Sequence, residues 1–204
     1  MRKLTLTLLT LIAIASVAWS QPELYLGGGV AFPTGPSTFK DNWKMGYNGT
    51  GGIGFTFAPG LSVIFTASYS TFPIDESGII SKAGIPAGVS VSVDGGTITA
   101  LDFAGNIKYS FMPKGTSLYV VAGAGYLSMS ASDITIKVTS GTTSQTFTVK
   151  PNTESAFSTS IGAGVDFPVG AKLGIFVEGR YAIAFTSGES TSYVPVKAGV
   201  RIGF

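Results

Sequence analysis

The chain has 204 residues, contains neither cysteine nor histidine, and is 12% charged, about half the usual share for a globular protein. The lack of cysteine excludes a fold held by disulfide bonds, and the lack of histidine removes the commonest general base and the commonest metal ligand. The formal net charge of +2 rests on Arg2 and Lys3, so it gives no indication of a nucleic-acid or acidic partner.

The first twenty residues have the pattern of a secretory signal peptide. Arg2 and Lys3 precede an apolar run over residues 4–17, and Ala18 and Ser20 are the small residues that a cleavage site needs. A membrane helix takes about 20 apolar residues to cross roughly 30 Å of hydrocarbon, so this run is short for an anchor. We expect cleavage after Ser20 and a single domain over residues 21–204. The alternative is an uncleaved anchor.

Eight later segments alternate between apolar and other residues, which indicates β-strands with two unlike faces. They cover residues 24–32, 44–57, 61–69, 101–111, 118–127, 157–167, 173–185 and 194–204. Most are ten or more residues long, and a tilted strand needs roughly 9–11 residues to cross a bilayer. In segment 118–127, Leu118 and Val120 share one face, but Tyr119 and Val121 are apolar on the other. The orientation of that strand therefore stays open.

The connections between these strands fall into two kinds. Short turns containing proline or glycine, which set the backbone angles of tight turns, are predicted at 58–60, 112–116 and 168–172. The other connections are generally longer and rich in Ser, Thr, Gly and charge. Short turns on one rim and long loops on the other are typical of outer-membrane barrels.

Two of the long connections contain apolar alternation of their own. In the connection after the fifth strand, residues 133–138 and 145–150 flank Ser140-Gly141-Thr142. This pattern predicts a β-hairpin that extends the fifth and sixth strands. The connection from 73 to 97 holds apolar pieces, and we expect it to be partly ordered.

Alternation does not by itself say which face is outside, because a soluble barrel such as a lipocalin turns its apolar face inward. Here aromatic residues gather toward the ends of the apolar runs, as interfacial girdles do. The opposite face combines charge with glycine, as Arg201 between Gly199 and Gly203 illustrates, and glycine suits a narrow lumen that holds long side chains. The sequence therefore predicts an all-β fold, an eight-stranded antiparallel transmembrane up-and-down β-barrel.

The predicted lumen face carries most of the charge of the strands. Its charged residues are Asp102, Lys108, Asp166, Glu178, Arg180, Lys197 and Arg201, with Lys44 near the outer end. Charges in a narrow barrel need partners, since an isolated buried charge costs several kcal/mol or more. We expect a structural network of ion pairs in which Glu178 pairs with Lys197, Arg201 or both. The alternatives are a gate that passes small ions and an active site.

The chain resembles the small eight-stranded outer-membrane barrels of the OmpA/OmpX type. The resemblance rests on the alternation of the last strand up to Phe204 and on the seventh strand at Phe176–Tyr181. It implies a location in the bacterial outer membrane, contact with outer-membrane lipid, and recognition of the last strand by the barrel-assembly machinery. That last role falls on Val200, Ile202 and Phe204.

Enzyme function is not expected. Barrels of similar size that modify lipid A or cleave proteins use a catalytic histidine, which this chain lacks. No cofactor or metal motif is present either, because Gly27-Gly28-Gly29 lies within a predicted strand with no helix after it. Two hypotheses remain, a closed barrel with a structural or surface-interaction role and, as the alternative, a narrow pore for ions or small solutes. The sequence identifies no extracellular partner.

Overall fold

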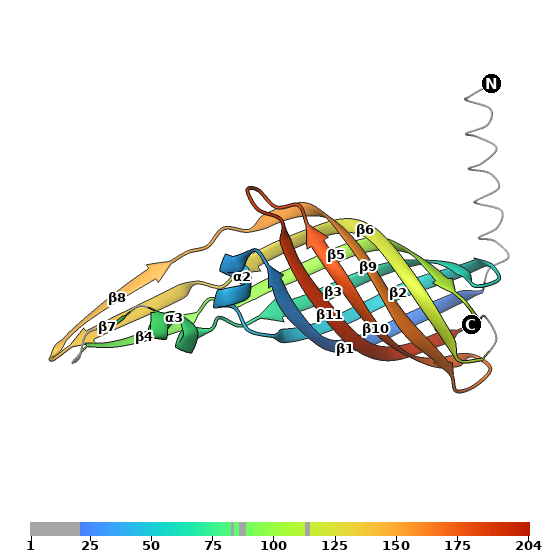
Figure 1. The fold of residues 1–204 in the computed structure, drawn as a ribbon, viewed down its shortest axis with the longest axis horizontal. Helices are drawn as coiled ribbons and strands as arrows, with labels where there is room; N and C mark the ends of the chain where they lie inside the picture. The colour runs from blue at the N-terminus through green and yellow to red at the C-terminus, as the bar shows by residue number, and fades with distance from the viewer. Residues whose placement is uncertain (1–20, 83, 86–88, 113–114) are drawn as a thin grey trace, which may run out of the picture.

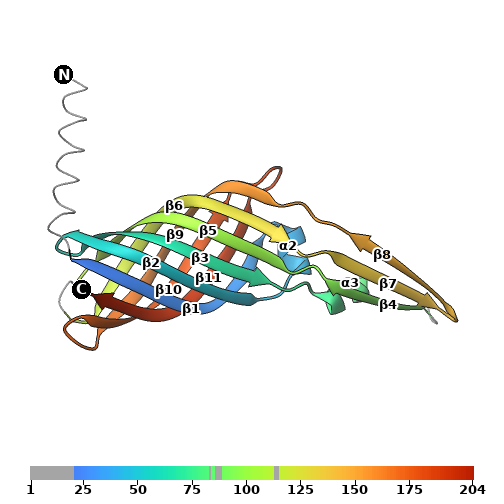
Figure 2. The same ribbon diagram turned by 180° about the vertical axis from the view of Figure 1, so that it is seen from behind.

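The computed structural model describes residues 21–82, 84–85, 89–112 and 115–204. Eight long strands form a closed antiparallel barrel in the order β1-β11-β10-β9-β6-β5-β3-β2, as Figures 1 and 2 show from two sides. The barrel strands are β1 (Pro22–Gly35), β2 (Gly46–Ala58), β3 (Leu61–Phe72), β5 (Ile98–Ser110), β6 (Ser117–Ala131), β9 (Glu154–Pro168), β10 (Leu173–Ala184) and β11 (Thr191–Gly203). The predicted eight-stranded antiparallel barrel is confirmed. The predicted signal peptide, residues 1–20, lies outside the described residues.

The alternation of the sequence maps directly onto the two faces of the barrel. Side chains of the apolar face point outward, and Phe65, Phe103 and Ile161 are each more than half exposed. Strand β6, whose orientation the sequence left undecided, also alternates between outward and inward side chains. Leu118 points outward, whereas Tyr119 is only 2% exposed and points into the barrel. The ambiguity arose because part of the lumen is itself aromatic and aliphatic.

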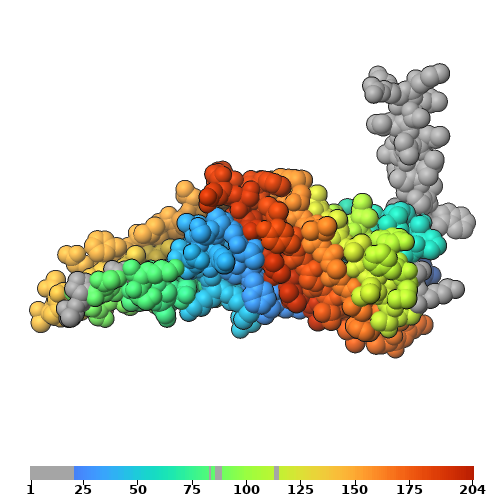
Figure 3. Space-filling view, viewed as in Figure 1, coloured from blue at the N-terminus to red at the C-terminus, as the bar shows by residue number. Residues whose placement is uncertain are grey.

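The two ends of the barrel differ. One end carries the short connections β2–β3, β5–β6 and β9–β10, of which residues 113–114 lie outside the described part. The other end carries the longer connections, including the short helices α2 (Ser37–Asn42) and α3 (Glu76–Lys82). Helix α2 was not predicted, and Figure 3 shows its blue atoms packed between the barrel and the loops that project from it. No helix in the described part of the chain is long and apolar enough to cross a membrane.

A second sheet projects beyond the loop end of the barrel (Figures 1 and 2). Its strands are β4 (Val89–Gly95), β7 (Ile134–Ser140) and β8 (Thr143–Val149), in the order β4-β7-β8. The predicted hairpin is therefore present as β7 and β8. It differs from the prediction because it forms a separate sheet with β4, a strand from another loop, instead of simply extending its two flanking barrel strands.

Candidate functional site

A first cluster of ion pairs fills the lumen toward the turn end. The Arg201 guanidinium contacts two carboxylates, with Nε 3.1 Å from Asp166 Oδ2 and Nη1 2.6 Å from Glu23 Oε1. Lys108 Nζ lies 3.0 Å from the same Asp166 oxygen. Glu23 was missed by the sequence analysis because the first strand was started at Leu24. Its inward orientation follows from its place two residues before Tyr25, which is buried in the lumen.

A second cluster lies deeper in the barrel around Glu178. Its Oε1 atom is 2.6 Å from Arg180 Nε and 3.2 Å from Lys197 Nζ, and its Oε2 atom accepts a hydrogen bond of 3.1 Å from the Tyr119 hydroxyl. Arg180 also donates to the side-chain oxygen of Asn106. Of the two cations expected beside Glu178, the structure places Lys197 there, whereas Arg201 belongs to the first cluster.

A layer of aromatic side chains lies between the two clusters, and one of its rings contacts both. Lys108 Nζ lies 4.1 Å from the centre of the Tyr119 ring, within the range of a cation–π contact. Because the Tyr119 hydroxyl donates to Glu178, this single ring touches both clusters. Tyr25 and Phe176 complete the layer, with ring centres 6.0 Å apart.

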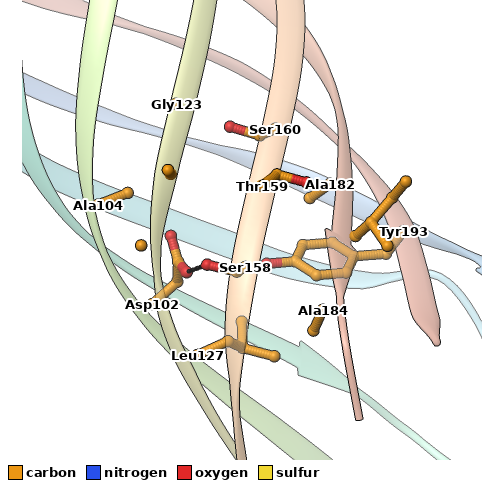
Figure 4. Close-up of a pocket in the computed structure, with 13 residues that line it drawn as sticks. Asp102, Ala104, Gly123, Leu127, Ser158, Thr159, Ser160, Ala182, Ala184 and Tyr193 are labelled. Atoms are coloured by element: carbon orange, nitrogen blue, oxygen red, sulfur yellow. Dashed lines mark hydrogen bonds between the residues drawn. The ribbon is translucent and has the colours of Figure 1, made fainter.

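Asp102 stands apart from both clusters. It accepts a hydrogen bond of 2.6 Å from Ser158 and forms no ion pair with any residue that the structure describes. Figure 4 shows this pair beside Tyr193 in a cavity of about 10 Å³. With Glu23 included, the described residues place four carboxylates and four cations in the lumen. These are Glu23, Asp102, Asp166 and Glu178 against Lys108, Arg180, Lys197 and Arg201.

Glycines in the barrel wall make room for the largest lumen side chains. A Cβ atom on Gly199 would lie 2.6 Å from the Phe176 ring, and one on Gly164 would lie 2.5 Å from the Tyr119 ring. Both distances are shorter than side chains tolerate, and the same Cβ atoms would also meet backbone oxygens of the neighbouring strands, Leu26 O at 2.2 Å and Val177 O at 2.5 Å. Glycine is therefore required at these wall positions.

An apolar plug closes the loop end of the lumen. Phe39 of α2 packs against Phe72 with ring centres 5.0 Å apart, and Phe72 packs against Tyr193 at 5.6 Å. Leu127 is the remaining large side chain of the plug. The plug also contains five alanines, Ala31, Ala100, Ala156, Ala182 and Ala184. The plug thus couples a surface helix to the wall of the barrel.

Three separate cavities lie in the lumen. A vestibule of about 320 Å³ enters from the turn end and reaches the first ion-pair cluster. Deeper in the barrel, the cavity around Glu178 measures about 20 Å³ and the one beside Asp102 about 10 Å³. A cavity needs roughly 10–15 Å³ to hold one water molecule, so each has room for about one.

Two further features bear on binding chemistry. Lys44 pairs with Asp75 at 3.0 Å at the loop end, where both are solvent-accessible, and so takes no part in the lumen. Within the described ranges, no group of three or more carboxylate, cysteine or histidine side chains is arranged to hold a metal ion.

Comparison with known proteins agrees with this geometry. The sequence matches the family model described as "Outer membrane protein beta-barrel domain" over residues 4–204. The solved structure of Neisserial surface protein A is 12% identical, covers 90% of this chain and 97% of its own, and has a TM-score of 0.56. At this identity the likeness shows the fold alone.

Two other solved structures are less similar. A major outer membrane protein from Thermus thermophilus is 11% identical, covers 91% of this chain and 99% of its own, and has a TM-score of 0.47. Ail, the attachment invasion locus protein of Yersinia pestis, is 13% identical, covers 90% and 97%, and has a TM-score of 0.42. No curated protein matches the sequence.

Proposed function

The chain belongs to the outer membrane protein beta-barrel domain family, and from this membership we propose that it is a closed, non-enzymatic barrel that anchors a protein-binding sheet at the cell surface. An integral protein of the bacterial outer membrane presents its long loops to the exterior and its short turns to the periplasm in the usual barrel topology. The projecting sheet β4-β7-β8 would then be extracellular.

The filling of the lumen supports a closed barrel. A permeating ion would have to pass the cluster around Glu178, where Arg180 and Lys197 are held by the same carboxylate, and then the plug formed by Phe39 and its neighbours. Breaking a buried ion pair costs about 3–5 kcal/mol, which disfavours spontaneous opening. The absence of histidine supports the non-enzymatic part of the proposal.

The alternative function, a narrow pore, is favoured by the vestibule of about 320 Å³ at the turn end. Single-channel recording of the refolded protein in a planar lipid bilayer separates the two. A closed barrel shows no discrete conductance steps, whereas reproducible steps would establish the pore and overturn the closed barrel.

The observation that carries the surface role is the open edge of β8. All seven of its residues, Thr143–Val149, are exposed, and none is charged, proline or glycine. Within the described residues its only strand partner is β7. Edge strands in water normally carry charge, proline or a bulge that prevents pairing with another chain. The open edge of β8 carries none of these protections.

The apolar face of the projecting sheet points to the same role. Val93, Ile136 and Phe147 are aligned across its three strands. Val93 is buried, but Phe147 at the open edge is 54% exposed. An extended, uncharged segment of a partner protein would add a strand to β8 and cover this ring, as in other recognition by β-strand addition.

We also propose that β11 is the strand read by the barrel-assembly machinery, as the resemblance implied. Val200 and Ile202 face outward on β11 beside Leu26 and Leu24 of β1, and the Phe204 ring is 60% exposed at the turn end. These side chains would therefore be available to the machinery before the barrel closes.

A peptide-binding measurement tests the surface role. The probe is a fluorescent, uncharged heptapeptide of alternating threonine and valine, titrated against the protein in lipid nanodiscs. Thr148→Lys places a charge on the open edge and should weaken binding by about tenfold or more, equivalent to ~1.4 kcal/mol. Thr142→Lys adds the same charge in the β7–β8 turn and should leave binding unchanged.

A second peptide provides the control for backbone pairing. Methylating alternate amides along one edge removes the hydrogen-bond donors that strand addition requires, so this peptide should not bind. Equal binding of the methylated peptide, or equal effects of the two lysine variants, would contradict strand addition on β8.

A further inference from the structure

A cavity of about 270 Å³ lies at the loop end of the barrel, on the outer side of the apolar plug. Its walls come from the segment around α2, the start of β5, the end of β6, the start of β9 and the β10–β11 connection. Trp43, Ile98 and Met129 line it and pack against the plug. Segments far apart in the chain thus converge on a cup with apolar and polar lining residues, at the end that carries the long loops.

The aromatic wall of this cup is fixed in place. The Trp43 indole N–H donates a hydrogen bond of 2.7 Å to the backbone oxygen of Gly96, and the Trp43 ring lies 6.0 Å from that of Phe39. The backbone of Trp43 also forms a β-bridge with Ile74. A wall that is already ordered loses little freedom when a ligand binds, which favours affinity.

The charge of the cup has one sign. Glu154 is the single charged residue of the lining, whose other polar members are Thr38, Ser130, Asn152, Thr186 and Thr191. One oxygen of Glu154, Oε1, accepts a hydrogen bond from the backbone N–H of Ser187, which orients the carboxylate. The other oxygen, Oε2, accepts no hydrogen bond from a residue that the structure describes and remains available to a ligand.

From this combination we propose that the cup binds a small organic cation with an apolar body, such as an aryl- or alkylammonium compound. The partly buried Trp43 ring, which lines the cup, suits an ammonium group through cation–π attraction, and Glu154 supplies the opposite charge. Against the roughly 10–15 Å³ that one water molecule needs, 270 Å³ leaves room for a compound of about ten non-hydrogen atoms. This inference does not depend on the peptide-binding role of β8.

Binding to the cup can be measured by the fluorescence of Trp43, which lines it. The chain contains two tryptophans, Trp43 and, in the predicted signal peptide, Trp19. Trp19→Phe therefore makes Trp43 the sole source of tryptophan fluorescence whether or not that peptide has been removed. Phenyltrimethylammonium is titrated into this variant in lipid nanodiscs. We expect a saturable change in emission with a dissociation constant at least about tenfold lower than that of tert-butylbenzene, its neutral isostere.

Charge variants complete the experiment. Glu154→Gln should weaken binding of the cation by about tenfold and bring it close to that of the neutral compound. Glu189→Gln removes a nearby exposed carboxylate that does not line the cup and should have no effect. If Glu154→Gln fails to fold, Thr38→Lys places a positive charge at the rim and should abolish binding of the cation.

Three results would overturn the proposal. They are the absence of saturable binding, equal affinity for the cation and its neutral isostere, and unchanged affinity for the cation in Glu154→Gln or Thr38→Lys. None of them bears on binding of the extended peptide to β8, so the two proposals fail independently.

Discussion

Glu178 and Lys197 face each other in the register of β10 and β11, with Oε1 and Nζ 3.2 Å apart. Arg180 reaches the same carboxylate from its own strand at 2.6 Å. One buried carboxylate therefore compensates two cations. Removing it affects more than a single pair, because both cations would lose their charged partner inside the barrel.

We predict that Glu178→Ala strongly destabilises the folded barrel. Leaving buried charges uncompensated costs about 3–5 kcal/mol, so the heat-modifiable folded band on gels should disappear at a clearly lower temperature. Glu76→Ala is the matched control, because Glu76 is an exposed residue of the α3 loop. Equal shifts in the two variants would show that Glu178 contributes no more than a surface carboxylate does.

Phe39→Ala tests the plug separately from the ion pairs. Truncating a buried phenylalanine costs about 3–5 kcal/mol, and Phe39 is 5% exposed. Even so, we expect no conductance steps in a planar bilayer, because the cluster around Glu178 still fills the barrel. Steps should require Phe39→Ala and Glu178→Ala together. Conductance in Phe39→Ala alone would mean that the ion pairs form no barrier.

The ion pair of Asp75 with Lys44 predicts acid sensitivity of the loop end. The hydrogen bond from Lys44, together with one from the backbone N–H of Gly78, lowers the pKa of Asp75. A carboxyl whose pKa is lowered by folding contributes stability above its unfolded pKa of about 3.9 and loses that contribution as the pH falls through the lower folded value. The loop end should therefore loosen below about pH 4.

Trp43 emission reports this loosening, because the backbone N–H of Asp75 is bonded to Asn42, next to Trp43. In the Trp19→Phe background the acid-induced change should be present with Asp75 and absent in Asp75→Asn. A change of the same size in both proteins would assign it to other groups.

Single cysteines test the sidedness of the barrel, since the chain has none of its own. Ser144→Cys lies in the projecting sheet and should react with a membrane-impermeant maleimide on intact cells. Lys172→Cys lies in the exposed β9–β10 turn at the opposite end and should react only after the outer membrane is opened. Ready labelling of Lys172→Cys on intact cells would show that the turn end is extracellular and that the proposed topology is inverted.

Removal of the Phe204 ring tests the role proposed for the last strand. Phe204→Ala should lower the amount of protein inserted in the outer membrane while export across the inner membrane continues. Phe185→Ala removes another exposed outward ring, at the loop end, and is the control. Normal insertion of Phe204→Ala would contradict recognition through this residue.

The sequence predicts the barrel well because alternation records, residue by residue, which face meets lipid. Where the lumen is also apolar this record is ambiguous, and Tyr119 and Val121 left the orientation of β6 open for that reason. Helix α2 was missed because six residues with one buried side chain, Phe39, show no helical period. The pairing of β4 with β7 joins two different loops, and no local pattern encodes such a contact.

The sequence predicted which charged side chains face the lumen more completely than it predicted which of them form ion pairs with one another. Strand parity placed seven charged side chains inside, but the distances along the barrel axis decide which of them meet. The tilt of the strands carries Arg201 to Asp166 and Glu23 instead of Glu178. The cup around Trp43 and Glu154 had no signal in the sequence, because its lining comes from five separate segments.

The wall glycines limit how this lumen can change in evolution. A Cβ atom on Gly199 would lie 2.2 Å from the backbone oxygen of Leu26, and one on Gly164 would lie 2.5 Å from that of Val177, in addition to their contacts with the Phe176 and Tyr119 rings. Shrinking a facing ring would therefore not make room for a side chain, because the neighbouring strand would still be in the way. Homologous barrels with the same strand spacing should keep glycine at these two positions even where the facing ring has been replaced.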